Sequence, residues 1–215
     1  MQSADEVRVY RGQTLSGAWL DDLDLRGLDL TETTLSGVNL RKVGLGGAIL
    51  TRTNWARVEL SSCDLQRADL QDAAFEGARL QQCNLAQVQL VGARVRNAHF
   101  LDCMMPGLCM DGARWKDVVV EGADTPYLSA EKAVLLRCRF ANQRLGGAPL
   151  MRARLGAAFL LECDLRFANL YAADLRGAVL IRCDLSDAHF DDADLTGTVL
   201  VDCKSERTDW ANCRR

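Results

Sequence analysis

The chain is poor in several residue types, and each shortage narrows the possible structures. Of its 215 residues, 6% are aromatic, three are proline and two are histidine. So few aromatic side chains are consistent with a narrow interior that has little room for rings. The formal net charge of −3 gives no strong field of one sign, as nucleic-acid binding would need. No apolar run approaches the roughly 20 residues of a membrane span, and the polar, acidic start does not resemble a secretory signal.

What the sequence has instead is a five-residue period. From Tyr10 to Trp210 every fifth residue is apolar with few exceptions, and most of these residues are Leu. We call this residue the centre. A small residue, usually Ala or Cys, stands two positions before it, Asp or Asn often stands directly before it, and Gly recurs two positions after it. Five fits neither the helical period of 3.6 nor the strand period of 2, so a short structural repeat is indicated.

A coil with one large and one small inward side chain per unit explains these residue types. The chain must turn sharply after each unit, which favours Gly, Asn and Asp. Backbone groups then pair with the next coil at the spacing of neighbouring strands, about 4.8 Å. The expected structure is a solenoid in which each coil contacts only its neighbours.

These units resemble those of pentapeptide-repeat proteins. The residues that carry the resemblance are Cys63-Asp64-Leu65-Gln66-Arg67, Ala68-Asp69-Leu70, Ala173-Asp174-Leu175-Arg176-Gly177 and Ala193-Asp194-Leu195-Thr196-Gly197. The resemblance implies an all-β fold: a right-handed quadrilateral β-helix with four units per coil and about ten coils, on the order of 50 Å long. We expect one domain over residues 1–215, with a lead-in at 1–8 and a tail at 211–215.

The repeat weakens between residues 124 and 136. Thr125 and Pro126 are typical of a helix start, and Ser-Ala-Glu-Lys-Ala-Val-Leu-Leu follows with good helix formers. We expect a loop or short helix here, the alternative being poor coils that keep the path. Loops that protrude from solenoids often bind partners, which makes Tyr127, Glu131 and Lys132 candidate binding residues.

The nine cysteines look like core residues rather than a disulfide or metal framework. Eight of them occupy the small inward position, where Cys is an apolar filler, and the spacing of twenty among Cys63, Cys83 and Cys103 is no zinc pattern. Cys109 is the exception, at an outward position. Unpaired thiols suit a reducing compartment, so we expect a cytoplasmic protein.

No residue pattern indicates catalysis. His99 and His189 both stand directly before a centre, where they replace Asp or Asn. The sequence holds no glycine-rich phosphate loop, nucleophile elbow or metal-ligand cluster. We therefore expect no enzyme, no cofactor and no metal.

Folding the sequence at twenty residues shows an apolar stripe in the C-terminal half. Three centres are flanked on both sides by apolar outward residues: Phe159, Leu161, Val179, Ile181, Val199 and Val201. Met151 and Tyr171 are expected on an adjacent face, where they would extend the stripe. A patch of this kind indicates an interface, and the alternative is β-propensity alone. The partner would be another protein, or a second copy bound through the stripe or an open end.

Acidic residues gather near the same end: Asp184, Asp187, Asp191, Asp192, Asp194 and Asp202. Some members of the resembled family are acidic rods that imitate DNA and protect type II topoisomerases from inhibitors. The resemblance therefore implies, as a specific function, a DNA mimic that binds gyrase. The alternative is an adaptor, for example in a bacterial secretion or toxin system, that docks its partner through the apolar stripe. One continuous acidic face would favour mimicry, and mixed charge beside the stripe would favour the adaptor.

Overall fold

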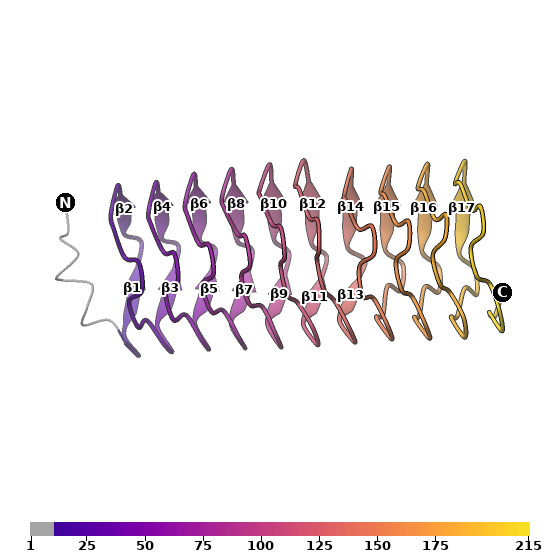
Figure 1. The fold of residues 1–215 in the computed structure, drawn as a ribbon. Helices are drawn as coiled ribbons and strands as arrows, with labels where there is room; N and C mark the ends of the chain where they lie inside the picture. Colours follow the sequence, from indigo (N-terminus) through magenta and orange to yellow (C-terminus); the bar gives the residue numbers. More distant parts are fainter. Residues whose placement is uncertain (1–10) are drawn as a thin grey trace.

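The computed structural model describes residues 11–215 as a rod of stacked coils (Figure 1). The expected lead-in at 1–8 lies outside the described residues. Each coil takes twenty residues and turns at four corners, so the rod has four faces. We number the faces by their centres in one coil: face 1 at Leu15, face 2 at Leu20, face 3 at Leu25 and face 4 at Leu30.

Two faces carry three-residue strands, all parallel. Face 1 holds a seven-stranded sheet in the order β1-β3-β5-β7-β9-β11-β13, and face 2 holds a ten-stranded sheet from β2 to β17. The strands are β1 Thr14–Ser16, β2 Trp19–Asp21, β3 Thr34–Ser36, β4 Asn39–Arg41, β5 Asn54–Ala56, β6 Glu59–Ser61, β7 Ala74–Glu76, β8 Arg79–Gln81, β9 Arg94–Arg96, β10 His99–Leu101, β11 Arg114–Lys116, β12 Val119–Glu121, β13 Val134–Leu136, β14 Arg139–Ala141, β15 Phe159–Leu161, β16 Val179–Ile181 and β17 Val199–Val201.

Faces 3 and 4 are held by single bridges in the same register, such as Asp24 with Gly44 and Asp29 with Ile49. The ten strands of face 2, one per coil, confirm the expected solenoid of about ten coils. Residues 211–215 are not a separate tail, because Arg214 bridges Asp194 and so continues the last coil.

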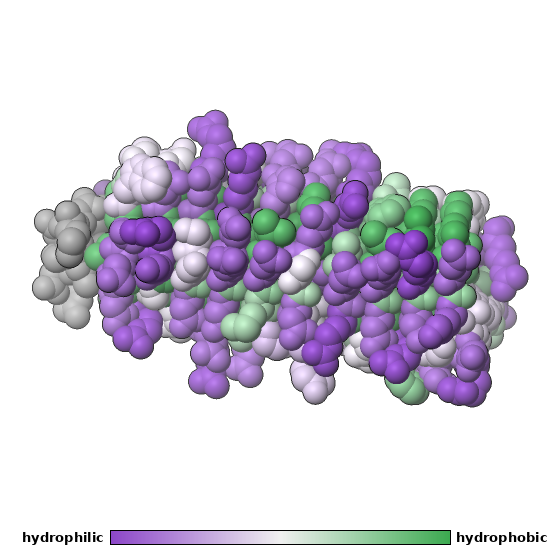
Figure 2. All heavy atoms as spheres, turned by 90° about the horizontal axis from the view of Figure 1, so that it is seen from above, coloured by the Kyte–Doolittle hydropathy of each residue, from purple (hydrophilic) through white to green (hydrophobic). Residues whose placement is uncertain are grey.

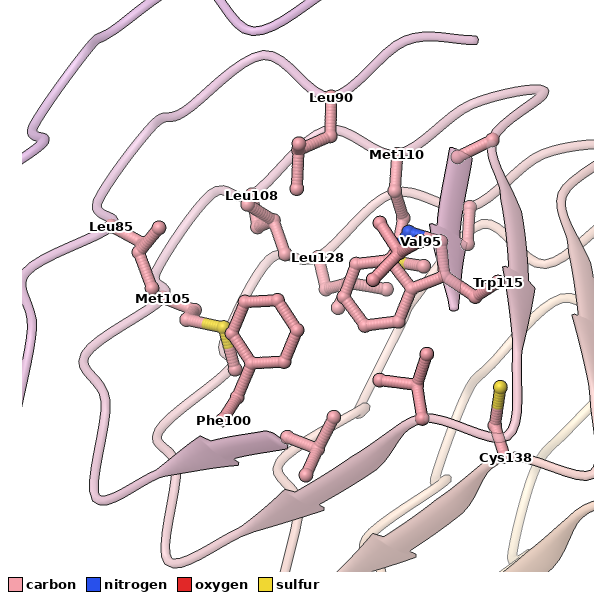
Figure 3. Close-up of a cluster of buried hydrophobic side chains, with 14 of the residues drawn as sticks. Leu85, Leu90, Val95, Phe100, Met105, Leu108, Met110, Trp115, Leu128 and Cys138 are labelled. Carbon is pink, nitrogen blue, oxygen red and sulfur yellow. The ribbon is translucent and has the colours of Figure 1, made fainter. Parts of the chain in front are cut away.

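The centres and the small residues form the core, as the repeat predicts. Most are less than 5% exposed, from Leu20 onward. The few buried rings stack along the axis: Trp55 on Phe75 at 5.5 Å between centroids, and Phe100 on Trp115 at 5.1 Å. Figure 3 shows the second pair among leucines and two methionines, Met105 and Met110. Ring stacking lets a narrow core hold large side chains.

The corners require left-handed backbone two positions after each centre. Gly27 and Gly177 adopt it with φ of 66° and 65°. This is the recurrent Gly of the repeat, which enters that region without a steric cost.

The prediction of a loop or short helix at 124–136 is wrong, because this segment continues the coil. Asp124 bridges Met104, Ser129 bridges Cys109, and β13 pairs with β11 in the usual register. The repeat is disguised here because large and small residues exchange places: Leu128 occupies the small position and Ala130 the centre, and both are buried. Stacking between coils overrides the helix propensity of so short a segment.

The same region nevertheless contains a defect, which we call the polar seam. Within the described residues, the regular backbone bonds from the amides of Thr125 and Tyr127 to the next coil are absent. In the coil before, Met105 and Gly107 donate such bonds to Asp124 and Pro126 at 2.8 Å each. At the seam Thr125, a centre, and Gln143, a small position, are each only 1% exposed.

Side chains replace part of the missing backbone pairing in the seam. The Thr125 hydroxyl lies 3.3 Å from Gln143 Oε1 and 3.4 Å from the Arg144 carbonyl oxygen, and the Gln143 amide donates to the Ala141 carbonyl oxygen at 2.5 Å. Buried polar atoms need such partners. The seam is therefore a polar layer inside an otherwise apolar core.

Candidate interaction surfaces

The predicted apolar stripe forms on face 2. Cα partners run Phe159, Val179, Val199 in one column and Leu161, Ile181, Val201 in the other. The four stripe residues on β15 and β16 are half-buried. The two on β17, Val199 and Val201, are 48% and 39% exposed. Figure 2 looks down on this face and shows hydrophobic side chains, in green, gathered over the C-terminal coils.

Charge borders the stripe on its N-terminal side. The Arg139 guanidinium lies over the Phe159 ring, 5.2 Å from its centroid, and Arg139 Nε lies 3.4 Å from Glu121. A cation over a ring face is an attractive contact. The stripe therefore begins at β15 and continues through β16 and β17.

Met151 and Tyr171 do not extend the stripe. They follow the face 4 centres, Leu150 and Leu170, whereas the stripe flanks the face 2 centres Leu160 and Leu180. Ten residues are half a coil, so the two sets lie on opposite faces of the rod. The expectation of an adjacent face was wrong for this reason.

The three loop candidates do not gather into a site. Tyr127 is 83% exposed, at a corner with φ of 61°, and Lys132 is exposed at the next corner along the chain. Glu131 is half-buried on face 4, and its backbone amide donates to Asp111 at 2.8 Å. Tyr127 and Lys132 lie at successive corners and Glu131 on the face between them, so the three form no common site.

The six acidic residues are spread around the rod. Asp184 lies on face 3, Asp191 on face 4 and Asp194 on face 1, while Asp187, Asp192 and Asp202 lie at three different corners. The single acidic face that mimicry of DNA would need is therefore not formed by these residues.

Several of these carboxylates are already bonded. Asp187 accepts two bonds from the Arg207 guanidinium at 2.6 Å each, which lowers the pKa of its carboxyl. Thr196 donates its hydroxyl and its amide to Asp194 and lowers the pKa of that group in the same way. Asp191 accepts from the Asn212 side chain at 3.1 Å.

Ion pairs between coils are a general feature of the surface. Arg52 pairs with Glu32 at 2.8 Å, Arg137 with Asp117 at 2.7 Å and Arg182 with Glu162 at 2.6 Å, each across one coil of twenty residues. Exposed pairs like these stabilise little. They do interleave the two signs of charge along the rod.

Six of the nine cysteines form one column at the corner between faces 2 and 3. Cys63, Cys83 and Cys103 continue, after Ala123 and Gln143, in Cys163, Cys183 and Cys203, because the register never shifts. The thiols face carbonyl oxygens, for example Cys63 Sγ to Leu40 at 3.4 Å. All nine are free, and residues 11–215 contain no group of His, Cys, Asp and Glu arranged for a metal.

Thiol labelling should divide the cysteines into two groups. Six are buried, while Cys109, Cys203 and Cys213 are partly exposed. Burial raises the pKa of Cys138 to about 12 and also raises the pKa of Cys109, so the reactive thiolate is scarce in both. With iodoacetamide at pH 8, mass spectrometry should find at most three labels on the folded protein and all nine after unfolding in urea. A fourth label under native conditions would contradict the burial of the other six thiols.

Four cations on β9 and β11 form a cluster that our sequence reading missed. Arg94 lies beside Arg114, and Arg96 beside Lys116. The signal was present, since the two Arg-x-Arg/Lys units stand twenty residues apart.

Taken together, the parallel ladders, the four-sided coil and the buried column of small residues define a β-solenoid that displays surfaces rather than enclosing a pocket. The family model for pentapeptide repeats matches at residues 14–47, 43–77, 78–114, 148–187 and 163–202, with eight copies. The chain therefore belongs to the pentapeptide-repeat family. The matched segments leave out 115–147, which contains the polar seam.

Solved structures agree with this assignment. HetL, a pentapeptide repeat protein involved in heterocyst differentiation regulation from the cyanobacterium Nostoc sp. strain PCC 7120, is 30% identical, with 90% of this chain and 85% of that chain covered and a TM-score of 0.52. QnrB1, a plasmid-mediated fluoroquinolone resistance protein, is 18% identical, with 89% and 85% covered and a TM-score of 0.52, and shows the fold alone. No curated protein matches the chain. Among the described residues, no helix is long and apolar enough to cross a membrane.

Proposed function

We propose that this protein is a non-catalytic docking rod that binds a protein partner through the apolar stripe. The observation that carries the proposal is the stack of three strands, β15 to β17, with six outward apolar side chains in register. The surface elsewhere is covered largely by interleaved charges. An apolar patch with a polar border is typical of an interaction site.

The size of the stripe argues for a heterologous partner rather than a second copy. Three strands at about 4.8 Å spacing cover only a small part of the roughly 800 Å² that each partner buries in a stable complex. The stripe therefore serves as the anchor, and the partner extends over the polar surface beside it. Two copies pairing stripe to stripe would bury too little area.

A non-catalytic role agrees with the interior of the rod. The voids along the core measure about 20 Å³ each and are lined mainly by leucines. Small-molecule sites are usually clefts of about 300 Å³ or more that bury most of the ligand, whereas the depressions of this size on the rod, about 340 and 450 Å³, are shallow and open to solvent. The nine free thiols suit a reducing compartment, so we propose a cytoplasmic location.

The DNA-mimic function has less support from the charge arrangement. Its carboxylates would need to follow one face like phosphates, whereas those near the C-terminal end are spread over several faces and corners. A gyrase supercoiling assay with and without a quinolone tests this function directly. We expect neither inhibition nor protection, and either effect would favour mimicry over the adaptor.

The double change Leu161→Lys and Ile181→Lys should weaken partner binding. Both residues lie in the same outward column of face 2, so the lysines place two charges in one column of the stripe without entering the core. Proteins captured by the immobilised wild-type rod would be identified by mass spectrometry, and each binary complex would be measured with purified components. We expect the affinity to fall at least tenfold.

The matched control changes Ser61 and Gln81 to Lys. These residues occupy the same column in coils far from the stripe. The control should retain binding, and circular dichroism should show that both variants fold. Equal affinity of the stripe variant, the control and the wild type would remove the proposal, and a concentration-dependent doubling of mass in light scattering would replace it with self-association.

A further inference from the structure

A cluster of four cations on face 1 is the second surface feature of the rod. We call Arg94, Arg96, Arg114 and Lys116 the basic square, because they lie two by two on the adjacent strands β9 and β11. All four are exposed. Together with Val134 and Leu136 of β13 they line a shallow depression of about 340 Å³.

The square gathers unpaired cationic side chains on two adjacent strands, whereas other unpaired cations, such as Lys42 and Arg57, stand singly at corners. Many arginines among residues 11–215 pair with a carboxylate, several of them one coil away, whereas the side chains of these four make no ion pair and no hydrogen bond. Two acidic residues border the square and also bond outside it: Glu76, opposite Arg96, accepts from the Asn97 side chain at 2.8 Å, and Asp117, next to Lys116 in the chain, binds Arg137.

This arrangement of like charges destabilises the rod when no ligand is bound. Like charges directly opposite each other on neighbouring strands repel, and the strands lie only about 4.8 Å apart. Arg94 faces Arg114, and Arg96 faces Lys116. An anionic ligand over the square would offset both repulsions at once.

The residues around the square restrict the kind of anion. In the coil before it, the same two columns hold Ala74 and Glu76, and in the coil after it they hold Val134 and Leu136, which are half-buried. The row of cations therefore ends after two coils, whereas a nucleic-acid backbone would need positive charge along a longer stretch of the rod. Two coils of positive charge followed by one apolar coil match a peptide that carries both acidic and apolar side chains.

We propose that the basic square binds an acidic segment of a protein partner, with carboxylates over the four cations and an apolar side chain on Val134 and Leu136. The bound segment lies extended along the rod axis on face 1. This site is separate from the apolar stripe, since it lies on another face and in other coils.

Fluorescence anisotropy with defined probes tests the proposal. The first probe is a fluorescein-labelled ten-residue peptide with four glutamates and two leucines, the second has glutamines in place of the glutamates, and the third is a ten-nucleotide oligothymidine. We expect the acidic peptide to bind, the glutamine peptide to bind at least tenfold more weakly, and the affinity to fall as salt rises.

The variant Arg94→Gln with Arg114→Gln should weaken binding of the acidic peptide about tenfold or more, because it removes one column of the square. The control Lys42→Gln with Arg57→Gln removes the same net charge from exposed corners outside the square and should leave binding unchanged. Equal binding by both variants would overturn the site. Tighter, square-dependent binding of the oligothymidine would overturn the peptide as its ligand.

A single charge reversal, Arg114→Glu, separates binding from folding. Its carboxylate would lie opposite Arg94 and replace a repulsion by an attraction. We expect Tm to rise by about 2 °C while binding of the acidic peptide is lost. A fall in both would mean that Arg114 serves the fold rather than a ligand.

Discussion

Trp115→Ala should lower the free energy of unfolding by about 3–5 kcal/mol, the range for large aromatic residues removed from a core. The side chain is 1% exposed and stacks on Phe100 at 5.1 Å. A filled solenoid has no second layer that could collapse into the space, so the cavity remains. Urea unfolding followed by circular dichroism measures the loss, and a loss under about 1 kcal/mol would contradict this account of the core.

A matched pair of conservative changes sharpens that prediction. The indole Nε1 of Trp115 is buried without an acceptor, whereas Nε1 of Trp55 donates to the Thr53 hydroxyl at 2.7 Å. Trp115→Phe therefore removes an unsatisfied donor, and Trp55→Phe removes a buried hydrogen bond. We expect Trp55→Phe to cost about 1 kcal/mol more; equal losses would show that the change in ring volume alone decides, and the reverse order would contradict the role given to the two Nε1 groups.

The second large effect concerns the polar seam. Thr125→Leu alone deprives the buried Gln143 Oε1 of its hydroxyl neighbour at 3.3 Å, and should cost about 1–3 kcal/mol. Gln143→Cys alone leaves the Thr125 hydroxyl with the Arg144 carbonyl oxygen at 3.4 Å and opens space beside it. The double variant places Leu at a centre and Cys in the cysteine column, as in neighbouring coils. It should be at least as stable as the wild type, because both polar partners leave together.

The measurement is a double-mutant cycle by urea unfolding, with hydrogen exchange at the backbone amides of Thr125 and Tyr127. We expect a coupling energy of about 1–3 kcal/mol between the two sites and slower exchange in the double variant. Because each coil contacts only its neighbours, a weak junction also lets the two halves unfold separately. Additive single effects with unchanged exchange would mean that the seam is not a unit.

Much of this architecture could be predicted from the sequence because the period is explicit. Each centre and small residue predicts its own burial, and folding at twenty placed Phe159, Val179 and Val199 in one column, as observed. Met151 was misplaced because nearness in sequence was taken for nearness of faces, although it lies half a coil from the stripe.

The remaining errors have physical causes. The helix expected after Thr125 was inferred from local helix propensity. Propensity does not include the backbone pairing that the preceding coil imposes on this segment. The exchange of Leu128 and Ala130 preserves total core volume while hiding the repeat. The basic square was missed because its two short units stand a full coil apart in the chain and the net charge of −3 averages them away.

The unbroken register of twenty residues makes the rod a molecular ruler. Inserting or deleting one whole coil between the basic square and the apolar stripe would change their separation by about 4.8 Å and leave the angle between them nearly as it is. Inserting a single five-residue unit would instead turn everything beyond it by one face. Variation in coil number could therefore tune how far apart two bound segments of a partner are held, while changes of part of a coil would aim them in different directions.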